Sequence, residues 1–308
     1  MNVAVLGSRP GWHAEQLQQA LEVRGHRCAL LPISRLIARV GGQPRLSSLK
    51  ADLDDFDIVL VRFIPRGSLE QIIFRMDALH LLEARGVRVI NRPQVIELTV
   101  DKLYTSGLLE QAGLPTPRTI VCEDSNEAMR AFAALGGDVV VKPLFGSMGR
   151  GLVRVEDEEL AYRVFKALDL ERAVYYLQET IPHHGYDIRA FVIGGRVVAA
   201  MERVADSWRT NVARGAQARP VTLTADQEAL CLQAARILAV DYAGVDLLPA
   251  TNGDLYLIEL NSVPGWQGLQ SVTPANIAEE LVIYLEAEHQ QQPTRNGRPA
   301  QLLGALDL

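Results

Sequence analysis

Two acidic side chains in the C-terminal half of the sequence could together hold a divalent metal ion. Asp246 and Glu259 lie on either side of Asn252-Gly253, a dipeptide typical of β-hairpin turns. A turn centred on this dipeptide pairs Asp246 with Glu259 on one face of the hairpin, with Cβ atoms about 5 Å apart. Two facing carboxylates repel each other unless a cation neutralises them. Because oxygen ligands suit Mg²⁺ or Mn²⁺, the spacing predicts a site for one of these ions.

A third oxygen ligand is expected from Asn261, which lies two residues beyond Glu259 and therefore on the same face of its strand. The same centring of the turn places Thr251 opposite Asp254. The alternative is that the two acids lie on a solvated strand face. The apolar residues around them favour the metal site.

A glycine-rich loop follows Lys142 and has the composition of a phosphate-binding loop. Gly146, Gly149 and Gly151 fall within six positions, and successive backbone N–H groups in such a loop can bind phosphate oxygens. The loop lacks the order of a P-loop and that of a dinucleotide fingerprint. Lys142 would add a charge for an α- or β-phosphate. The alternative is a flexible hairpin turn without a ligand.

Further charged and polar residues lie between these two motifs. Asp187 could bind a ribose hydroxyl or a substrate amine, and Arg189 and Arg203 could bind phosphates or carboxylates. Asn211 and Arg214 follow in a stretch that also contains glycine. Taken singly, each of these residues is more often a surface charge.

The elements that must position these residues begin with alternating strands and helices. Such an alternation predicts a parallel sheet with helices on both faces, and ligands bind such sheets beyond the C-terminal ends of the strands. Arg9, Arg62 and Arg66 lie at those ends, either as a pocket for an acidic substrate or as scattered surface charges. We expect strands at Val3–Leu6, Cys28–Leu31, Asp57–Val61 and Val87–Ile90, and helices at Trp12–Arg24 and Leu69–Ala84.

A helix capped by Thr99 and reaching Ala112 is expected next, which places Lys102 in its first turn. A cation there opposes the helix dipole, so an anion is expected nearby. Further elements are predicted as strands Val139–Lys142, Leu152–Val155 and Tyr175–Thr180, the last opening a third unit; helix Glu158–Leu168; a hairpin of Ile188–Ile193 with Arg196–Met201; a helix from the capping box of Thr224 and Gln227 to Val240; and a poorly ordered tail from His289.

The order of these motifs resembles the ATP-grasp superfamily and, within it, the RimK family of α-L-glutamate ligases. The resemblance covers about Met1 to Leu285 and is carried by Asp101-Lys102, Val141-Lys142-Pro143, the glycine loop, Gln178-Glu179, Asp187-Ile188-Arg189, Arg203, Asn211, Asp246 and Glu259-Leu260-Asn261. It implies an α/β protein, α+β in its C-terminal part, with an N-terminal Rossmann-like pre-ATP-grasp domain before an ATP-grasp fold. The expected units are 1–95, 96–176 with the flap, 177–288 with the metal site, and a tail at 289–308.

The resemblance also implies roles for single residues. Arg189, Arg203 and Asn211 match residues near the reacting groups, and Arg203 is expected to stabilise the transferring phosphoryl group. The matching metal ligands are Asp246, Glu259 and Asn261. The matching nucleotide contacts are Lys102 and Lys142 for phosphates, Gly146, Ser147, Met148, Gly149 and Gly151 in the flap, Gln178, Glu179, Thr180 and Ile181 beside adenine, and Asp187.

Two departures from the family pattern concern specificity. Met148 stands where many members have a polar flap residue, and Trp266 is expected near the acceptor.

The activity implied is an ADP-forming ligation of a carboxylate to an amine through an acyl phosphate, with ATP and Mg²⁺ or Mn²⁺ as cofactors. L-Glutamate is the expected amine, and the acceptor would be a peptide, a protein tail or a pterin-like cofactor. Alternatives are a D-alanine–D-alanine-like or glutathione-synthetase-like ligase and a non-catalytic ATP-binding module. The complete metal set disfavours the last. A homo-oligomer is possible, since the superfamily often forms dimers or tetramers.

Composition narrows the class of protein further. The 308 residues carry a formal net charge of -6 and a sequence pI near 5.6, which argues against nucleic-acid binding through phosphates. Cys28, Cys122 and Cys231 form no CxxC pair, and no apolar run is long enough to span a bilayer. We therefore expect a cytoplasmic protein with reduced thiols and no membrane partner.

Overall fold

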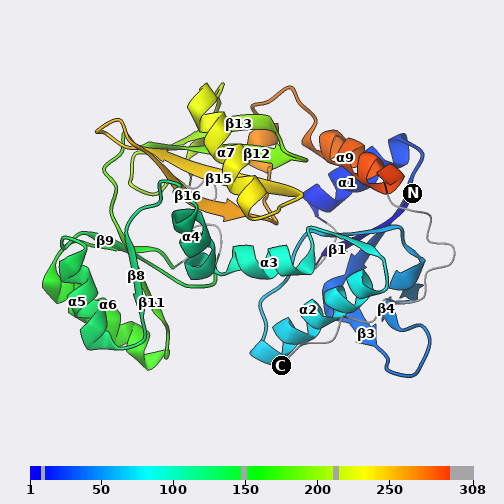
Figure 1. Ribbon diagram of the computed structural model, residues 1–308, viewed down its shortest axis with the longest axis horizontal. Coiled ribbons are helices and arrows are strands. Elements are labelled where there is room, and N and C mark those ends of the chain that lie inside the picture. The colour runs from blue at the N-terminus through cyan, green and yellow to red at the C-terminus, as the bar shows by residue number, and fades with distance from the viewer. Residues whose placement is uncertain (8–10, 147–150, 211–214, 292–308) are drawn as a thin grey trace.

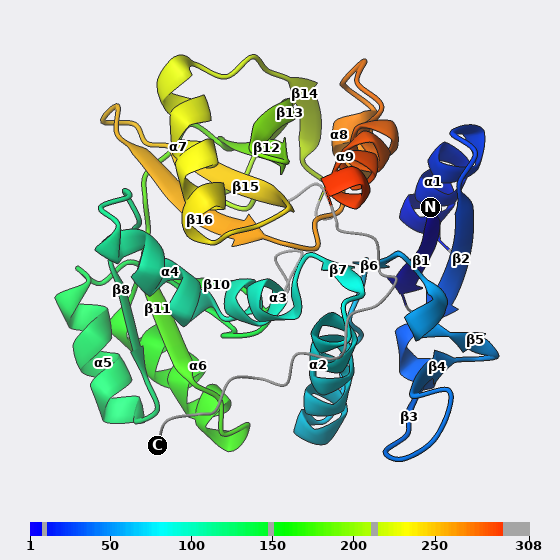
Figure 2. The ribbon, with the colours of Figure 1, turned by 45° about the vertical axis from the view of Figure 1, so that its right-hand side comes forward.

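The computed structural model describes residues 1–7, 11–146, 151–210 and 215–291. Three larger sheets, each with its own helices, follow one another along the chain (Figure 1). The first sheet lies to one side, and the second and third approach each other on the other side (Figure 2). The α/β architecture expected from the sequence is confirmed.

The first sheet is parallel in the order β2-β1-β6-β7, as the alternation of strands and helices predicts. A small antiparallel sheet and two 3₁₀ turns are inserted after β2. The elements of this unit are β1 Asn2–Gly7, α1 Trp12–Val23, β2 Arg27–Pro32, η1 Ile33–Arg35, β3 Leu36–Ala38, β4 Leu46–Ser48, β5 Ala51–Asp52, η2 Leu53–Asp55, β6 Ile58–Val61, α2 Leu69–Ala84 and β7 Arg88–Ile90.

Helices cover both faces of the first sheet. Met76, Leu79 and Leu82 of α2 pack on one face, and Leu17 and Leu21 of α1 pack on the other. The last described helix, α9 Ile277–Gln291, packs beside the first helix, α1, on that second face (Figure 1). The predicted tail therefore starts too early, because residues 289–291 still belong to α9; residues 292–308 lie outside the described part.

The second sheet is antiparallel in the order β10-β9-β11-β8, with α5 and α6 on one face. Because β11 pairs with both β9 and β8, it belongs to this sheet, and the expected boundary between residues 176 and 177 is wrong. Its apolar sequence indicated a strand but not the partners of that strand. The elements are β8 Thr119–Cys122, α5 Ser125–Ala134, β9 Val139–Lys142, β10 Val153–Val155, α6 Glu158–Leu170 and β11 Tyr175–Glu179.

The third sheet is antiparallel in the order β14-β13-β12-β15-β16. The hairpin of β12 and β13 forms across Gly194-Gly195, and both glycines have positive φ as a tight hairpin turn requires. The capping box of Thr224 and Gln227 begins α7 as predicted. The elements are β12 Tyr186–Ile193, β13 Arg196–Val204, β14 Gln217–Pro220, α7 Ala225–Ile237, β15 Tyr242–Pro249, β16 Leu255–Asn261 and α8 Gln267–Gln270.

Two consecutive helices, α3 Pro93–Val100 and α4 Lys102–Gln111, replace the single helix expected from Thr99. Asp101 is the N-cap of α4 and accepts a hydrogen bond from the Tyr104 amide at 3.0 Å. Thr99 lies inside α3, where its hydroxyl donates to the Val95 carbonyl oxygen at 2.8 Å. The predicted cap is therefore wrong by two residues, although Lys102 does lie in the first turn.

The hairpin of β15 and β16 pairs Asp246 with Glu259, as the sequence predicts. Its turn is one residue longer than expected, because the Ala250 amide donates to the Asp254 carbonyl oxygen at 2.8 Å. The predicted pairing of Thr251 with Asp254 is therefore wrong. A bulge between the turn and Asp246 compensates for the extra residue and restores the register at the acidic pair.

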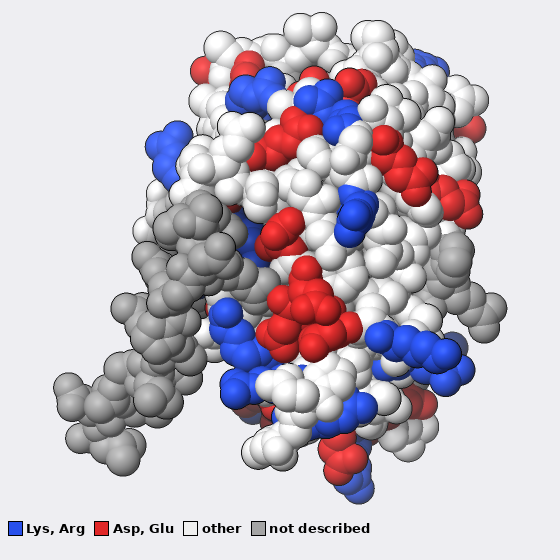
Figure 3. All heavy atoms as spheres, turned by 90° about the vertical axis from the view of Figure 1, so that its right-hand side faces the viewer, with Lys and Arg blue, Asp and Glu red and all other residues white. Residues whose placement is uncertain are grey.

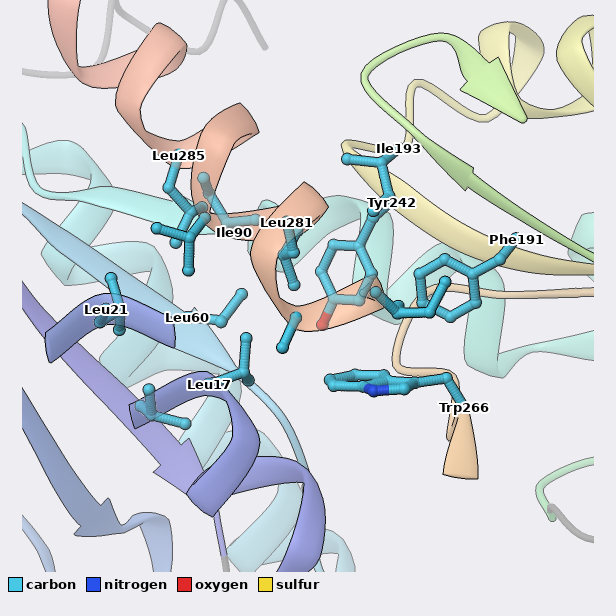
Figure 4. Packing of buried hydrophobic residues seen from close by; sticks show 14 of the residues in the cluster. Leu17, Leu21, Leu60, Ile90, Phe191, Ile193, Tyr242, Trp266, Leu281 and Leu285 are labelled. Carbon is cyan, nitrogen blue, oxygen red and sulfur yellow. The ribbon is translucent and has the colours of Figure 1, made fainter. Parts of the chain in front are cut away.

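Successive side chains on the strands of the third sheet point to opposite faces. One face is apolar, and the other is polar in one half and apolar in the other. Ile188, Ala190 and Val245 pack beneath α7 and α4. The opposite face is polar at one end, with Asp187 and Arg189, and apolar at the other, where it meets the first unit. Figure 4 shows this apolar junction, in which Phe191, Tyr242 and Trp266 face Leu60 and Leu281.

The surface that carries α1 and α9 mixes acidic and basic side chains, with an acidic group near its middle (Figure 3). A broad basic surface of the kind that nucleic-acid binders carry is not seen among the described atoms of this face. In the described part of the chain, no helix combines the length and apolar composition that crossing a bilayer demands.

Candidate active site

The main cleft lies between the second and third sheets and encloses about 1190 Å³, part of it open to solvent. β9 and β11 form one wall, β15 and β16 form the other, and the N-terminus of α4 closes one side. The predicted residues that line it are Lys102, Lys142, Gly146, Gln178, Glu179, Thr180, Ile181, Asp187, Arg203, Asp246 and Glu259. The structure thus brings together residues that are up to 157 positions apart in the sequence.

Asp246 is held by two arginines from neighbouring strands. Arg189 donates to both of its carboxylate oxygens, with Nη2 2.6 Å from Oδ2, and Arg203 Nη2 lies 2.9 Å from Oδ2. Burial works to raise the pKa of Asp246, but the two guanidinium charges outweigh it and hold the pKa below its usual range. The carboxylate is therefore ionised, and both of its oxygens accept from arginines.

Arg203 also links Asp246 to Asp187. Its Nε and Nη2 each donate to an oxygen of Asp187 at 2.6 Å, and the Thr210 hydroxyl donates to the same carboxylate at 2.5 Å. All three side chains are buried. Asp187 thus fixes the orientation of Arg203 at the cleft wall, a contact that sequence reasoning did not foresee.

Glu259 faces Asp246 without an arginine of its own. Among the described residues no cation lies within ion-pair distance of it. At longer range, its charge acts to raise the pKa of both Lys102 and Lys142. Asn261 lies next along the same face, and its side-chain oxygen accepts from the Val263 amide at 3.0 Å. No cluster of three or more His, Cys, Asp or Glu is placed for a metal within the described ranges, so a metal site here would need the Asn261 amide as its third donor.

Two lysines approach the cleft from different elements. Lys102 Nζ donates to the Gly146 carbonyl oxygen at 2.9 Å, which ties α4 to the start of the glycine loop. Lys142 Nζ donates to Gln178 Oε1 at 2.5 Å. Burial lowers the pKa of Lys142 to about 8, partly opposed by Glu259, and burial also lowers the pKa of Lys102. An incoming phosphate would raise the pKa of both lysines and so favour their charged forms.

The segment after β11 forms the far end of the cleft. Glu179 accepts from the Arg118 backbone amide at 2.8 Å and from its Nε at 2.7 Å, and the Thr180 amide donates to the Asp138 carbonyl oxygen at 3.1 Å. The Ile181 amide makes no hydrogen bond to the part of the chain that is described, and this residue lines the cleft. Such an edge offers backbone donors and acceptors to a planar base.

Four predicted residues, Ser147, Met148, Gly149 and Asn211, lie outside the described residues. Gly151 follows the gap in the loop with φ of 79°, a conformation that favours glycine. The adjoining Leu152 carbonyl oxygen accepts from Arg209 Nη2 at 2.6 Å, so the third unit contacts the end of the glycine loop.

Sequence reasoning missed several residues of the cleft wall, among them Ser106, Tyr176, Trp208, Arg209 and Thr210. Tyr176 could have been found from strand alternation, because it shares a face with Gln178 and lies opposite Lys142. Arg209 and Thr210 carried no signal beyond their position just before Asn211.

Trp266 lies in the apolar cluster that joins the first and third units. It is 0% exposed in the junction with the first unit, and therefore cannot touch an acceptor in this conformation. Arg62 is buried beside it, whereas Arg66 is exposed and Arg9 lies outside the described residues. Neither Arg62 nor Arg66 lines the cleft between the second and third sheets.

Comparison with known proteins agrees with this geometry. A family model described as the RimK-like ATP-grasp domain matches residues 99–285. A tetrahydromethanopterin:α-L-glutamate ligase of Methanococcus maripaludis is 33% identical over 288 residues, covering 92% of this chain and 97% of that protein. A probable α-L-glutamate ligase of Azotobacter vinelandii is 31% identical over 306 residues, covering 96% and 99%.

Solved structures share the fold. The ATP-grasp ligase PsnB, complexed with minimal precursor, Mg and ADP, has a TM-score of 0.73 at 22% identity and covers 93% of this chain and 97% of its own. A RimK domain protein from Sphaerobacter thermophilus has a TM-score of 0.73 at 21% identity and covers 92% and 99%. With residues 99–285 matched and relatives aligned along nearly their whole length, the chain belongs to the RimK-like ATP-grasp family and is an ATP-dependent ligase.

Proposed function

We propose that this ligase adds L-glutamate to an acceptor that ends in a carboxylate, and that the acceptor is a pterin-like cofactor. The observation that carries the proposal is the convergence of two lysines, Arg203 and two facing acids on one cleft, with Arg189 paired to one of these acids, Asp246. The glutamate and the pterin are supported by the names of relatives that align along nearly the full chain. A peptide acceptor is the second candidate, because fold neighbours include ligases complexed with precursor peptides.

In the proposed reaction the acceptor carboxylate attacks the γ-phosphate of ATP, which gives an acyl phosphate and ADP. The amine of glutamate then attacks the acyl carbon and releases phosphate. The chain contributes mainly position and charge. Lys102 and Lys142 would hold the phosphates, and the edge at 179–181 would receive adenine.

Arg203 is the proposed group for the transferring phosphoryl and for the oxyanion that forms at the acyl carbon. Asp187 holds its guanidinium in place and is itself held by the Thr210 hydroxyl, so the charge needs little rearrangement during the reaction. Arg189, which also pairs with Asp246, is the proposed group for the acceptor carboxylate.

The donor set of Asp246, Glu259 and Asn261 fits Mg²⁺ or Mn²⁺, because it offers only oxygens and leaves positions for phosphate. A bound divalent ion would supply charge neutralisation between phosphate oxygens. Asp246 would bind the ion with oxygens that also accept from the two arginines. Glu259 pairs with no arginine among the described residues, so it would bind the ion without giving up an ion pair.

The proposal is tested by incubating the protein with ATP, MgCl₂, L-glutamate and one acceptor at a time. Tetrahydromethanopterin, a folate monoglutamate and a peptide ending in glutamate are compared by ADP formation and by product mass. We expect a product heavier by one glutamyl residue, formed with tetrahydromethanopterin and dependent on both substrates. Glutamylation of the peptide alone would reassign the acceptor, and ADP formation without any amide product would refute the proposal.

A further inference from the structure

The loop formed by residues 262–266, here called the acceptor-side loop, follows directly after the proposed metal ligand Asn261. The adenine edge lies at one end of the cleft, and Asp246 and Glu259 lie at the other. Because the attacking carboxylate must lie in line with and opposite to departing ADP, it must enter from beyond the acidic pair. Along β16 that direction leads to Asn261 and then to this loop, so the inference rests on the proposed function.

Side chains of the first unit hold the backbone of this loop at three points. Asn91 Nδ2 donates to the Ser262 carbonyl oxygen at 2.7 Å. Arg62 Nη2 donates to the Pro264 carbonyl oxygen at 2.7 Å. His13 Nε2 accepts from the Trp266 amide at 3.0 Å, and burial lowers the pKa of His13 to about 4, so its ring is neutral at physiological pH. The loop therefore takes its shape from a different unit of the chain.

Arg62 makes the most extensive of these contacts. Its Nη1 donates to the Tyr242 hydroxyl at 2.8 Å, and its guanidinium lies 4.5 Å from the centre of the Trp266 ring. Figure 4 shows Trp266 beneath Tyr242 and Phe191, facing residues of the first unit. Within the described residues no acid pairs with Arg62, which is 8% exposed. The planar guanidinium donates hydrogen bonds along two edges while its face covers an aromatic ring. Lysine and glutamine side chains do not reproduce this geometry.

The loop in turn limits the position of Arg189. A Cβ added to Gly244 would lie 3.0 Å from both Pro264 Cβ and Arg189 Nη1, so these two side chains border the same small space above the bare backbone of Gly244. A shift of Pro264 would therefore change the space in which Arg189 reaches Asp246. Through Pro264, the position of Arg62 is linked to the arginine proposed for the acceptor carboxylate.

We propose that Arg62 is a positioning residue for acceptor binding: it fixes the acceptor-side loop from the first unit, and thereby the place of Arg189, without touching the nucleotide. Arg62 does not line the nucleotide cleft, whereas the loop that it holds continues from the metal-ligand strand. Its loss therefore weakens acceptor binding selectively.

The experiment compares Arg62→Met and Arg62→Lys with Arg85→Met, a control in the same unit whose Nε pairs with Asp54 at 2.7 Å. The first measurement is hydrogen–deuterium exchange of the protein without substrates. We expect faster exchange in peptides covering 262–266 for both Arg62 variants, larger for Met, and unchanged exchange there for the control. Unchanged exchange of this loop in the Arg62 variants would overturn the proposal.

The second measurement is steady-state kinetics with tetrahydromethanopterin as acceptor. We expect Arg62→Met to raise the acceptor KM about tenfold while the KM for ATP changes by less than about twofold, with Arg62→Lys intermediate. Equal increases in both KM values would indicate a general structural role and overturn the proposal. A wild-type protein that glutamylates no acceptor would refute the proposed function, and the exchange data would still decide whether Arg62 positions the loop.

Discussion

The two facing acids of the cleft differ in how the protein balances their charge. Asp246 is buried and receives hydrogen bonds from Arg189 and Arg203, so its charge is part of a compact ion-pair network. Among the described residues Glu259 has no such partner, and it interacts with the charges of Lys102 and Lys142 at longer range. Although the two acids face each other across the hairpin, removing their charges should therefore affect stability differently and turnover alike.

Replacing each acid by its amide separates these two effects. We expect both Glu259→Gln and Asp246→Asn to abolish amide formation, because each removes a proposed metal ligand. Asp246→Asn should also lower the free energy of unfolding by about 3–5 kcal/mol, since it leaves Arg189 without its carboxylate and Arg203 with Asp187 alone. Glu259→Gln should change it by less than about 1 kcal/mol. Urea unfolding and ADP release measure the two quantities.

Glu202→Gln is the matched control, because Glu202 neighbours Arg203 on β13 and its side chain points to the opposite face of the sheet. It should alter neither quantity. Normal turnover in Glu259→Gln would remove this residue from the metal site, and equal unfolding energies for the two variants would contradict the assigned charge balance.

At the scale of single elements, the first turn of α4 places Lys102 at the cleft. A lysine in the first turn opposes the helix dipole, and Asp101 directly before it supplies the cap that the helix needs. Lys102 then reaches the Gly146 carbonyl oxygen at the base of the glycine loop. The position of Lys102, the lysine proposed to bind phosphate, thus depends on a cap that has no proposed part in the reaction.

Asp101→Ala should lower the free energy of unfolding by about 1 kcal/mol and raise the KM for ATP, because the first turn of α4 frays and Lys102 loses its place. Asp157→Ala is the control: Asp157 caps α6 by accepting from the Leu160 amide at 2.8 Å, on the face of the second sheet away from the cleft. It should cost similar stability and leave the KM for ATP unchanged. Equal KM values for both variants would show that the α4 cap does not position Lys102.

Local signals in the sequence predicted most elements, because caps and turns act between near neighbours. The capping box of Thr224 and the Gly194-Gly195 turn were both read correctly. The pairing of Asp246 with Glu259 was also correct, although a longer turn and a bulge offset each other. Partners distant in sequence left no such signal: β11 was assigned to the wrong unit, and the burial of Trp266 depends on Arg62, which lies 204 positions away.

At the scale of the whole molecule, the first unit is joined closely to the third, while the second unit faces the third across the cleft (Figure 2). Asn91, which is 0% exposed, donates to the carbonyl oxygens of Tyr242 and Ser262 and accepts from the Asp241 amide. α9 packs beside α1 in the same junction. The first and third units are therefore packed together, and the second unit faces them across the cleft.

Arg209 connects the two walls of the cleft, because it comes from the third unit and donates to Leu152 at the end of the glycine loop. An acyl phosphate is hydrolysed when water reaches it, so the contact between the walls should govern how much ATP is spent per amide formed. We expect Arg209→Ala to raise the ratio of ADP to amide product severalfold, measured on the same samples by a coupled assay and by mass spectrometry. Arg219→Ala, at an exposed position on β14, should keep the wild-type ratio. A slower Arg209→Ala enzyme with an unchanged ratio would show that Arg209 serves binding or chemistry and not the exclusion of water.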